Sequence, residues 1–103
     1  MQSTRVSRYT GRMEFEWDPR KATANLRKHK VSFHEAATVF GDFLASTVAD
    51  PDHSGSEHRY LTVGQSERGR MLIIAHTDRQ GRIRIISARK LTRVEKRAYE
   101  ETQ

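Results

Sequence analysis

The chain contains no cysteine and only two prolines among its 103 residues. The missing cysteine excludes disulfides and thiolate metal sites. No apolar run approaches the roughly eighteen residues of a membrane-spanning helix, and residues 1–12 lack the apolar stretch of a secretory signal peptide. We therefore expect a cytoplasmic protein that makes no contact with membranes. No glycine-rich phosphate loop is present either, which argues against nucleotide triphosphate chemistry.

Acidic residues are missing from two parts of the chain that are rich in cations. Residues 20–30 hold five Lys/Arg and no acid, and residues 68–97 hold ten Lys/Arg and two acids. Between them, residues 35–57 hold five acids and no Lys/Arg. The formal net charge is +6. The positive charge is therefore concentrated in two segments, which gives the molecule an uneven electrostatic potential. The anion that best matches such basic segments in a small protein is the phosphodiester backbone of a nucleic acid.

Local signals predict eight elements. Asp18-Pro19 combines a helix cap with a proline at the first helical position. Ser32 with Glu35, and Thr92 with Glu95, have the spacing of capping boxes, in which the glutamate reaches back to the cap amide. The predicted strands are 14–18, 43–50, 57–65, 70–77 and 82–89, and the predicted helices are 19–29, 32–41 and 92–101.

The expected fold class is α+β, in the order β-α-α-β-β-β-β-α. Turns of about four residues join the last three strands, which predicts an antiparallel meander. The two N-terminal helices should pack on one face of the sheet, and a C-terminal helix follows. We place a single domain at residues 13–103 and expect a flexible leader at 1–12.

The predicted strand 82–89 alternates apolar residues with cations. A buried unpaired cation is costly, so the face that carries the cations should point to water or to an anion. Strict alternation puts Arg82 and Arg84 on one face and Arg89 on the other, with Lys90 opposite Arg89. Arg89 is the preferred candidate for a site at the end of this strand.

The sequence resembles the BrnT family over nearly all of residues 13–100. The likeness lies in 15–22 (FEWDPRKA), in Lys28-His29 followed by 31–33 (VSF), and in 84–90 (RIISARK). One departure is visible, because the family often has a glycine where this chain has Lys30. We interpret that departure as a surface change.

The resemblance implies a RelE-like fold and a type II toxin that cleaves RNA and arrests translation, with no cofactor. It also implies a DNA-binding antitoxin of the ribbon-helix-helix type, through which alone operator DNA would be bound. We expect the antitoxin to mask part of the 82–97 surface. The alternative is a non-catalytic module that binds nucleic acid or regulates an operon.

RNA cleavage without a metal needs a base for the 2′-hydroxyl, cations for the transition-state charge and an acid for the leaving oxygen. Segment 52–59 packs two imidazoles, two carboxylates and an arginine together. The candidate catalytic residues are therefore His53, Glu57, Arg59 and Arg89. A loop-capping role for His53 and a simple ion pair between Glu57 and Arg59 remain open. No metal is expected, because ligand spacing such as H-E-x-x-H is missing.

Further cations are candidates for RNA contacts. They are Lys21, Lys28, Arg79, Arg82, Arg84, Lys90, Arg93 and Arg97. A solvated helix face is the alternative for the last two. His76 is interpreted as a satisfied core histidine, Tyr99 as a packing residue, and His29 as the end of the first helix.

Overall fold

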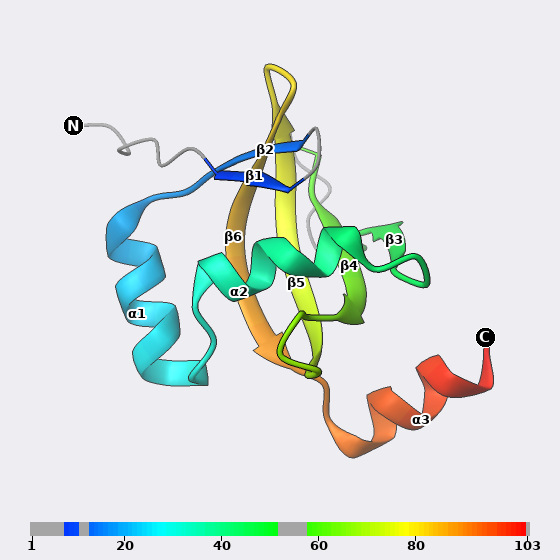
Figure 1. The fold of residues 1–103 in the computed structure, drawn as a ribbon. Coiled ribbons are helices and arrows are strands. Elements are labelled where there is room, and N and C mark those ends of the chain that lie inside the picture. The colour runs from blue at the N-terminus through cyan, green and yellow to red at the C-terminus, as the bar shows by residue number, and fades with distance from the viewer. Residues whose placement is uncertain (1–7, 11–12, 52–57, 103) are drawn as a thin grey trace.

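The computed structural model describes residues 8–10, 13–51 and 58–102 of the chain. Six strands, three α-helices and one 3-10 turn follow one another along this part (Figure 1). Their bounds are β1 Arg8–Thr10, β2 Met13–Glu16, α1 Pro19–His29, α2 Phe33–Thr38, η1 Val39–Gly41, β3 Ser46–Ala49, β4 Tyr60–Gln65, β5 Met71–Arg79, β6 Arg82–Lys90 and α3 Arg93–Glu101.

The strands form one sheet in the order β1-β2-β6-β5-β4-β3. The predicted meander is confirmed, because β4, β5 and β6 pair antiparallel in sequence. The pairing of β2 with β6 is parallel and short, joining Phe15 to Ile83 and Glu16 to Arg84. Strand β1 was not predicted: it lies within the proposed leader and pairs antiparallel with β2. The rest of that leader lies outside the described residues.

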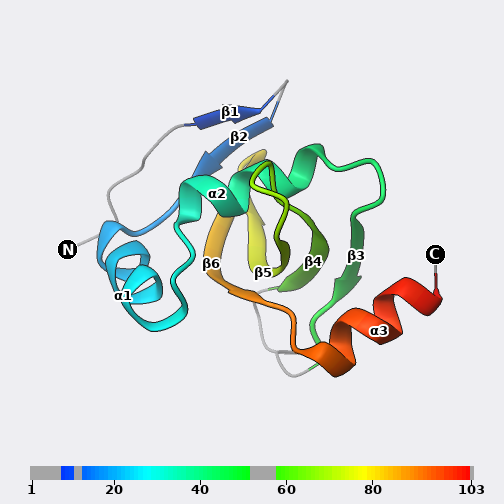
Figure 2. The same cartoon turned by 60° about the horizontal axis from the view of Figure 1, so that its bottom comes forward.

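Helices α1 and α2 lie on the same face of the sheet, and α2 crosses in front of β5 and β6 (Figures 1 and 2). The core fills the space between them. Its buried apolar residues are Phe15, Trp17, Val31, Phe33, Ala36, Ala37, Val39, Leu72, Ile74, Ile85 and Ala88. The opposite face of the sheet, called the outer face below, carries the residues that alternate with Leu72 and Ile74 on β5.

The predicted start and end of α1 are confirmed. The Asp18 side chain accepts a hydrogen bond from the Arg20 amide at 2.9 Å, and Pro19 occupies the first helical position. After His29, the chain turns at Lys30 with φ of 61°, in the left-handed region that favours glycine. Lys30 is thus more than a surface change, since it adopts a backbone conformation that costs a residue with a Cβ about 1 kcal/mol or more.

The predicted capping box of α2 is only half formed. Ser32 accepts from the Glu35 amide at 3.0 Å, as expected. The Glu35 carboxylate does not return to Ser32, however. It is buried and accepts hydrogen bonds from the Ser66 hydroxyl and from two guanidinium nitrogens of Arg70. The prediction was wrong because a cation 35 residues away in the sequence competes for the carboxylate.

A β-bulge changes the faces of β6. Ala75 pairs with Ser87 and His76 pairs with Ile85, so Ile86 is an extra residue in the strand. The bulge reverses the alternation at this point. Arg82 and Arg84 consequently share the outer face with Arg89, and the prediction that they point to opposite faces was wrong. All of the arginines on β6 therefore project from the face that α1 and α2 leave uncovered.

Helix α3 follows the end of β6 and extends away from the sheet (Figure 1). Its predicted capping box is present in full, with Thr92 and Glu95 bonding to each other's backbone amides. None of its residues is buried. The Tyr99 hydroxyl, which donates to the Leu44 carbonyl, ties the helix to the turn before β3. In the described parts of the chain, no helix has the length and apolar character needed to cross a bilayer.

Candidate nucleic-acid interface

A hollow of about 260 Å³ lies on the outer face, where β4, β5 and β6 run side by side. Its floor is apolar and its rim is charged. The residues that line it are Asp50, Arg59, Leu61, Ile73, Ala75, Ser87 and Arg89. This outer-face cavity brings together two of the four predicted catalytic residues, Arg59 and Arg89, which lie thirty residues apart in the chain.

The Arg89 guanidinium is held in a fixed orientation. Its Nη1 and Nη2 atoms donate to the two carboxylate oxygens of Glu95 at 2.8 and 2.9 Å. These hydrogen bonds are the main reason that the pKa of Glu95 is lowered to about 2, and they raise the pKa of Arg89. About 40% of the Arg89 side chain remains exposed. The guanidinium therefore stays charged, oriented and open to a ligand.

Arg59 is half-buried and lies immediately before β4. Its carbonyl accepts a hydrogen bond from the Asp50 amide at 2.9 Å, which joins the two chain segments at the rim of the cavity. Within the described part of the chain, its side chain makes no ion pair. His53 and Glu57 lie in segment 52–57, outside the described residues, so their roles stay predictions.

Asp50 and Ser87 also line the cavity, and neither was a catalytic or RNA-binding candidate from the sequence. Asp50 lies two residues before the start of the 52–59 cluster, and that proximity was the available signal. Ser87 is two residues before Arg89 in β6, so strand alternation, which places both on the outer face, was the available signal. The described cavity thus offers two guanidiniums, a hydroxyl and a carboxylate over an apolar floor.

Arg82 and Arg84 face carboxylates of β2 instead of open solvent. Arg82 lies 3.3 Å from Glu14, and Arg84 donates to Glu16 at 3.1 Å. Glu16 is buried, and the Arg84 side chain is only 14% exposed. These pairs cancel the positive charge at the β2 end of the outer face. Both arginines remain predicted RNA contacts, but each already has an anionic partner.

The other predicted contacts lie outside the described lining of this cavity. Arg79 pairs with Arg82 in the ladder beside the β5–β6 turn, and Lys90, Arg93 and Arg97 are exposed at the opposite end of β6 and on α3. Lys21 and Lys28 project from α1 beside β6, where they line a second hollow that also includes His29.

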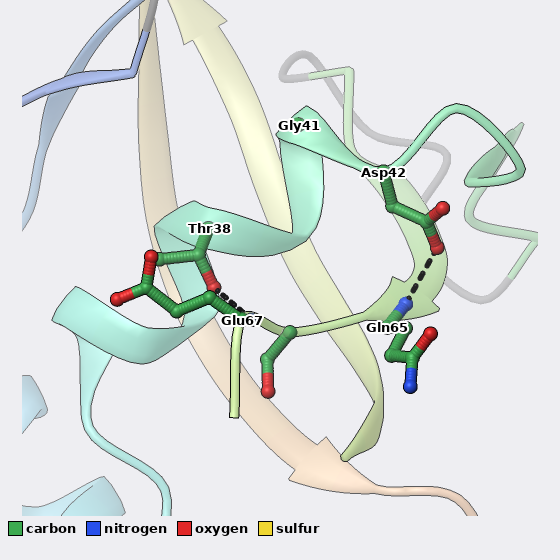
Figure 3. A pocket seen from close by; sticks show the side chains of 6 residues that line it. Thr38, Gly41, Asp42, Gln65 and Glu67 are labelled. Carbon is green, nitrogen blue, oxygen red and sulfur yellow. Dashed lines mark hydrogen bonds between the residues drawn. The ribbon is translucent and has the colours of Figure 1, made fainter. Parts of the chain in front are cut away.

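A larger hollow, of about 410 Å³, lies between η1 and the end of β4 (Figure 3). Its polar groups hold the fold together: Asp42 accepts from the Gln65 amide at 2.8 Å, and the Thr38 hydroxyl accepts from the Glu67 amide at 3.0 Å. Its described lining contains two carboxylates and no cation. A phosphodiester would be repelled there, so the RNA candidate is the outer-face cavity.

His76 is buried in the core as predicted, but it is not fully satisfied: among the described residues, no group bonds to its buried Nδ1 atom. Its Nε2 atom is 2.7 Å from the Thr62 hydroxyl, and its ring lies between those of Phe40 and Tyr60. Burial lowers its pKa to about 4. Tyr99 likewise serves packing and a hydrogen bond to Leu44, and burial raises its pKa.

The fold and the outer-face cavity define a small basic α+β protein that presents oriented arginines on one side of a sheet. Residues 17–95 match the profile of a family described as the ribonuclease toxin, BrnT, of type II toxin–antitoxin systems. The chain belongs to the BrnT family.

A solved relative supports the fold. The structure is similar to the crystal structure of the Brucella abortus ribonuclease toxin BrnT, with a TM-score of 0.56 and 23% sequence identity. The match covers 75% of this chain and 94% of the Brucella chain. No curated protein matches the sequence.

Proposed function

We propose that the outer-face cavity is the active site of a ribonuclease toxin that cleaves RNA without a metal ion and arrests translation. The observation that carries the proposal is the convergence of Arg59 and Arg89 on one hollow, with Arg89 fixed by Glu95. Two guanidiniums can hold the non-bridging oxygens of a phosphate and offset the charge that grows on them in the transition state. Membership of the BrnT family supports the same activity.

In the proposed reaction, the RNA 2′-oxygen attacks the adjacent phosphorus while a base removes its proton. The bond from phosphorus to the 5′-oxygen breaks, and an acid protonates that oxygen. The products are a 2′,3′-cyclic phosphate and a 5′-hydroxyl. Asp50 supplies a carboxylate at the cavity rim for the base role. His53 and Glu57 remain proposed as further proton-transfer groups, because they follow Asp50 closely in the sequence.

A direct test combines growth and chemistry. Expression of the chain alone should arrest growth, and purified protein should cleave RNA in the presence of EDTA and leave 2′,3′-cyclic phosphate ends. Arg59→Ala and Arg89→Ala should each lose most of the turnover, whereas Arg27→Ala should not, since Arg27 lies outside the described lining of the cavity. A substrate with 2′-deoxy sugars should stay intact. Normal growth together with intact RNA would refute the proposal.

A non-catalytic nucleic-acid-binding or operon-regulating module is the second candidate. It is favoured by one observation: in the described lining of the cavity, Asp50 is the one carboxylate and no histidine is present. In that case the arginines would only neutralise phosphates. Arg89→Ala would then weaken RNA binding and its salt dependence, and no cleavage product would form with any variant.

The proposed partner is a DNA-binding antitoxin of the ribbon-helix-helix type that covers part of the 82–97 surface and alone contacts operator DNA. This surface includes Lys90 and the first turns of α3, whose residues are largely exposed. A partner that covers α3 would also reach the Arg89–Glu95 pair. Co-purification and hydrogen exchange of the complex would test this: protection that leaves 82–97 unchanged would refute it.

A further inference from the structure

A second cationic hollow, of about 250 Å³, lies where α1 covers the free edge of β6. Here called the α1 cavity, it is lined by residues that include Lys21, Asn25, Lys28, His29, Ile86 and Ser87. It forms because β2 pairs with β6 only near residues 83 and 84, which leaves the rest of that edge to the helix.

The walls of the α1 cavity are fixed by the buried side chain of Asn25. Its Nδ2 atom donates to the Ala88 carbonyl at 2.8 Å and to the Val31 carbonyl at 3.0 Å. Its Oδ1 atom accepts from the Ala88 amide at 3.1 Å. Because one side chain satisfies both backbone groups of Ala88, α1 cannot slide along β6 without losing these bonds.

The α1 cavity and the outer-face cavity meet at a single residue. Ser87 lines both of them. Ser87 shares the outer face with Arg89, two residues further along β6, while Ile86, the extra residue of the bulge, lines the cavity beside the helix. Ser87 therefore connects the cavity that contains Arg59 and Arg89 to the one that Lys21 and Lys28 line.

The charge distribution favours this direction over the opposite one. Residues 19–30 contain five Lys/Arg and no acid, and the described lining of the α1 cavity contains no carboxylate. At the other end of the outer face, Arg82 and Arg84 are already matched by Glu14 and Glu16. A phosphodiester chain would thus gain more favourable electrostatic energy by extending towards α1 than by extending towards the β2 end.

We propose that the α1 cavity is a second RNA subsite, in which Lys21 and Lys28 bind the backbone phosphate of a nucleotide that flanks the scissile link. The inference rests on the proposed function of the outer-face cavity. It names the path of the substrate: from Arg59 and Arg89, across Ser87, onto α1. A substrate too short to reach α1 would forgo this contact.

The test compares Lys28→Gln with Arg27→Gln. The two residues are neighbours near the end of α1 and lose the same charge, but in the structure only Lys28 lines the cavity. The probes are a long, labelled 2′-O-methyl oligonucleotide, which cannot be cleaved through its 2′-oxygen, and the corresponding dinucleotide. Affinity is measured over a range of salt concentrations. Lys21→Gln provides an independent variant on the same cavity.

For the long probe, Lys28→Gln and Lys21→Gln should each weaken binding and reduce the slope of log affinity against log salt by about 0.7, the value for one phosphate contact on a single strand. Arg27→Gln should leave that slope unchanged, and the dinucleotide should not distinguish the variants. Equal slopes for Lys28→Gln and Arg27→Gln would overturn the subsite.

The two proposals fail in different ways. If the protein cleaves RNA but substitution of Lys21 or Lys28 has no selective effect on binding, the subsite is refuted and the nuclease proposal stands. If these lysines do affect binding selectively but the wild-type protein cleaves no RNA, the binding path is supported and the nuclease proposal is refuted. Weaker binding by Arg84→Gln than by Lys28→Gln would show that the strand runs towards β2 instead, which would also overturn the inference.

Discussion

Arg89 and Glu95 form a two-point hydrogen-bonded ion pair between the end of β6 and the first turn of α3. The same carboxylate accepts from the Thr92 amide and so completes the capping box of the helix. One side chain thus starts α3 and orients the guanidinium in the outer-face cavity. The position of α3 and the geometry of the candidate active site are therefore coupled through Glu95.

Glu95→Gln should separate these two roles. Glutamine can still complete a capping box, so stability should fall by less than about 1 kcal/mol. An amide cannot accept from both guanidinium nitrogens, because one of its two arms carries hydrogens instead of a lone pair. Turnover on RNA should therefore fall, and the NMR signal of the Arg89 Nε–H group should broaden or shift.

Thr92→Ala is the matched control for Glu95→Gln. It removes the cap of α3 and should cost about 1 kcal/mol, yet it leaves the Arg89–Glu95 pair in place. At a temperature where both variants are folded, turnover on RNA should fall for Glu95→Gln and stay near the wild-type value for Thr92→Ala. If Thr92→Ala lost as much turnover as Glu95→Gln, the effect would belong to the helix as a whole and not to the ion pair.

Much of the fold was predictable because its signals are local. Asp18-Pro19 predicts the start of α1, and the spacing of Thr92 and Glu95 predicts the start of α3; both signals involve residues within one turn of each other. The strand predicted at 43–50 is shorter in the structure, Ser46–Ala49. Asp42 explains the difference, since its side chain and carbonyl accept from the Leu44 and Ala45 amides and form a turn.

The faces of β6 and the partner of Glu35 could not be predicted, because both depend on distant segments. Alternation along β6 fails at Ile86, where the pairing with β5 inserts a bulge. Glu35 satisfies the capping pattern but is drawn to Arg70 across the fold. Arg89 was a candidate from its place at the end of a basic strand, whereas the position of Asp50 in one cavity with Arg59 and Arg89 depends on the assembled sheet, which no local pattern describes.

Arg70→Met should lower the free energy of unfolding by about 3 kcal/mol. The Glu35 side chain is 4% exposed, and the substitution removes its main cation, which leaves a buried charge poorly compensated. Arg70 also donates to the Lys30 carbonyl at 3.0 Å, and that bond would be lost too. Urea denaturation of the wild type and the variant measures the difference.

Two variants control for Arg70→Met. Arg68→Met removes a cation that is 3.7 Å from Glu35 but 69% exposed, so it should cost less than about 1 kcal/mol. The double variant Glu35→Gln/Arg70→Met should recover part of the loss, since no buried charge remains. A double variant that is less stable than Arg70→Met alone would contradict this account.

Lys30→Gly should stabilise the protein by up to about 1 kcal/mol. Lys30 has a φ of 61°, a conformation that glycine adopts without the steric cost of a Cβ. The gain is reduced by the loss of the hydrogen bond from Lys30 Nζ to the Arg27 carbonyl, an exposed bond of 3.1 Å. Lys30→Ala is the control: it loses the same bond but keeps the Cβ, so it should be no more stable than the wild type in thermal unfolding. An increase in stability with alanine would argue against the backbone explanation.

Acid should destabilise the protein through His76 before the carboxylates contribute. Burial beside Phe40 and Tyr60 lowers the pKa of His76 from 6.5 to about 4, although nearby Asp78 acts in the opposite direction. As pH falls below 6.5, the unfolded chain binds a proton at this position that the folded chain does not. The contribution of His76 to the free energy of unfolding is therefore fully present above pH 6.5, the pKa of the unfolded chain. It is lost as pH falls towards 4, and the total loss is about 3 kcal/mol.

The variant His76→Phe isolates this contribution, because it keeps an aromatic ring in the core and cannot titrate. Its absolute stability can differ from that of the wild type, since Thr62 loses a partner. The informative quantity is the change of the unfolding free energy with pH. Between pH 6.5 and about 4, the wild-type curve should fall more steeply than the variant curve, and above pH 7 the two should run parallel. Parallel curves over the whole range would mean that His76 accepts a proton in the folded state as easily as in the unfolded one.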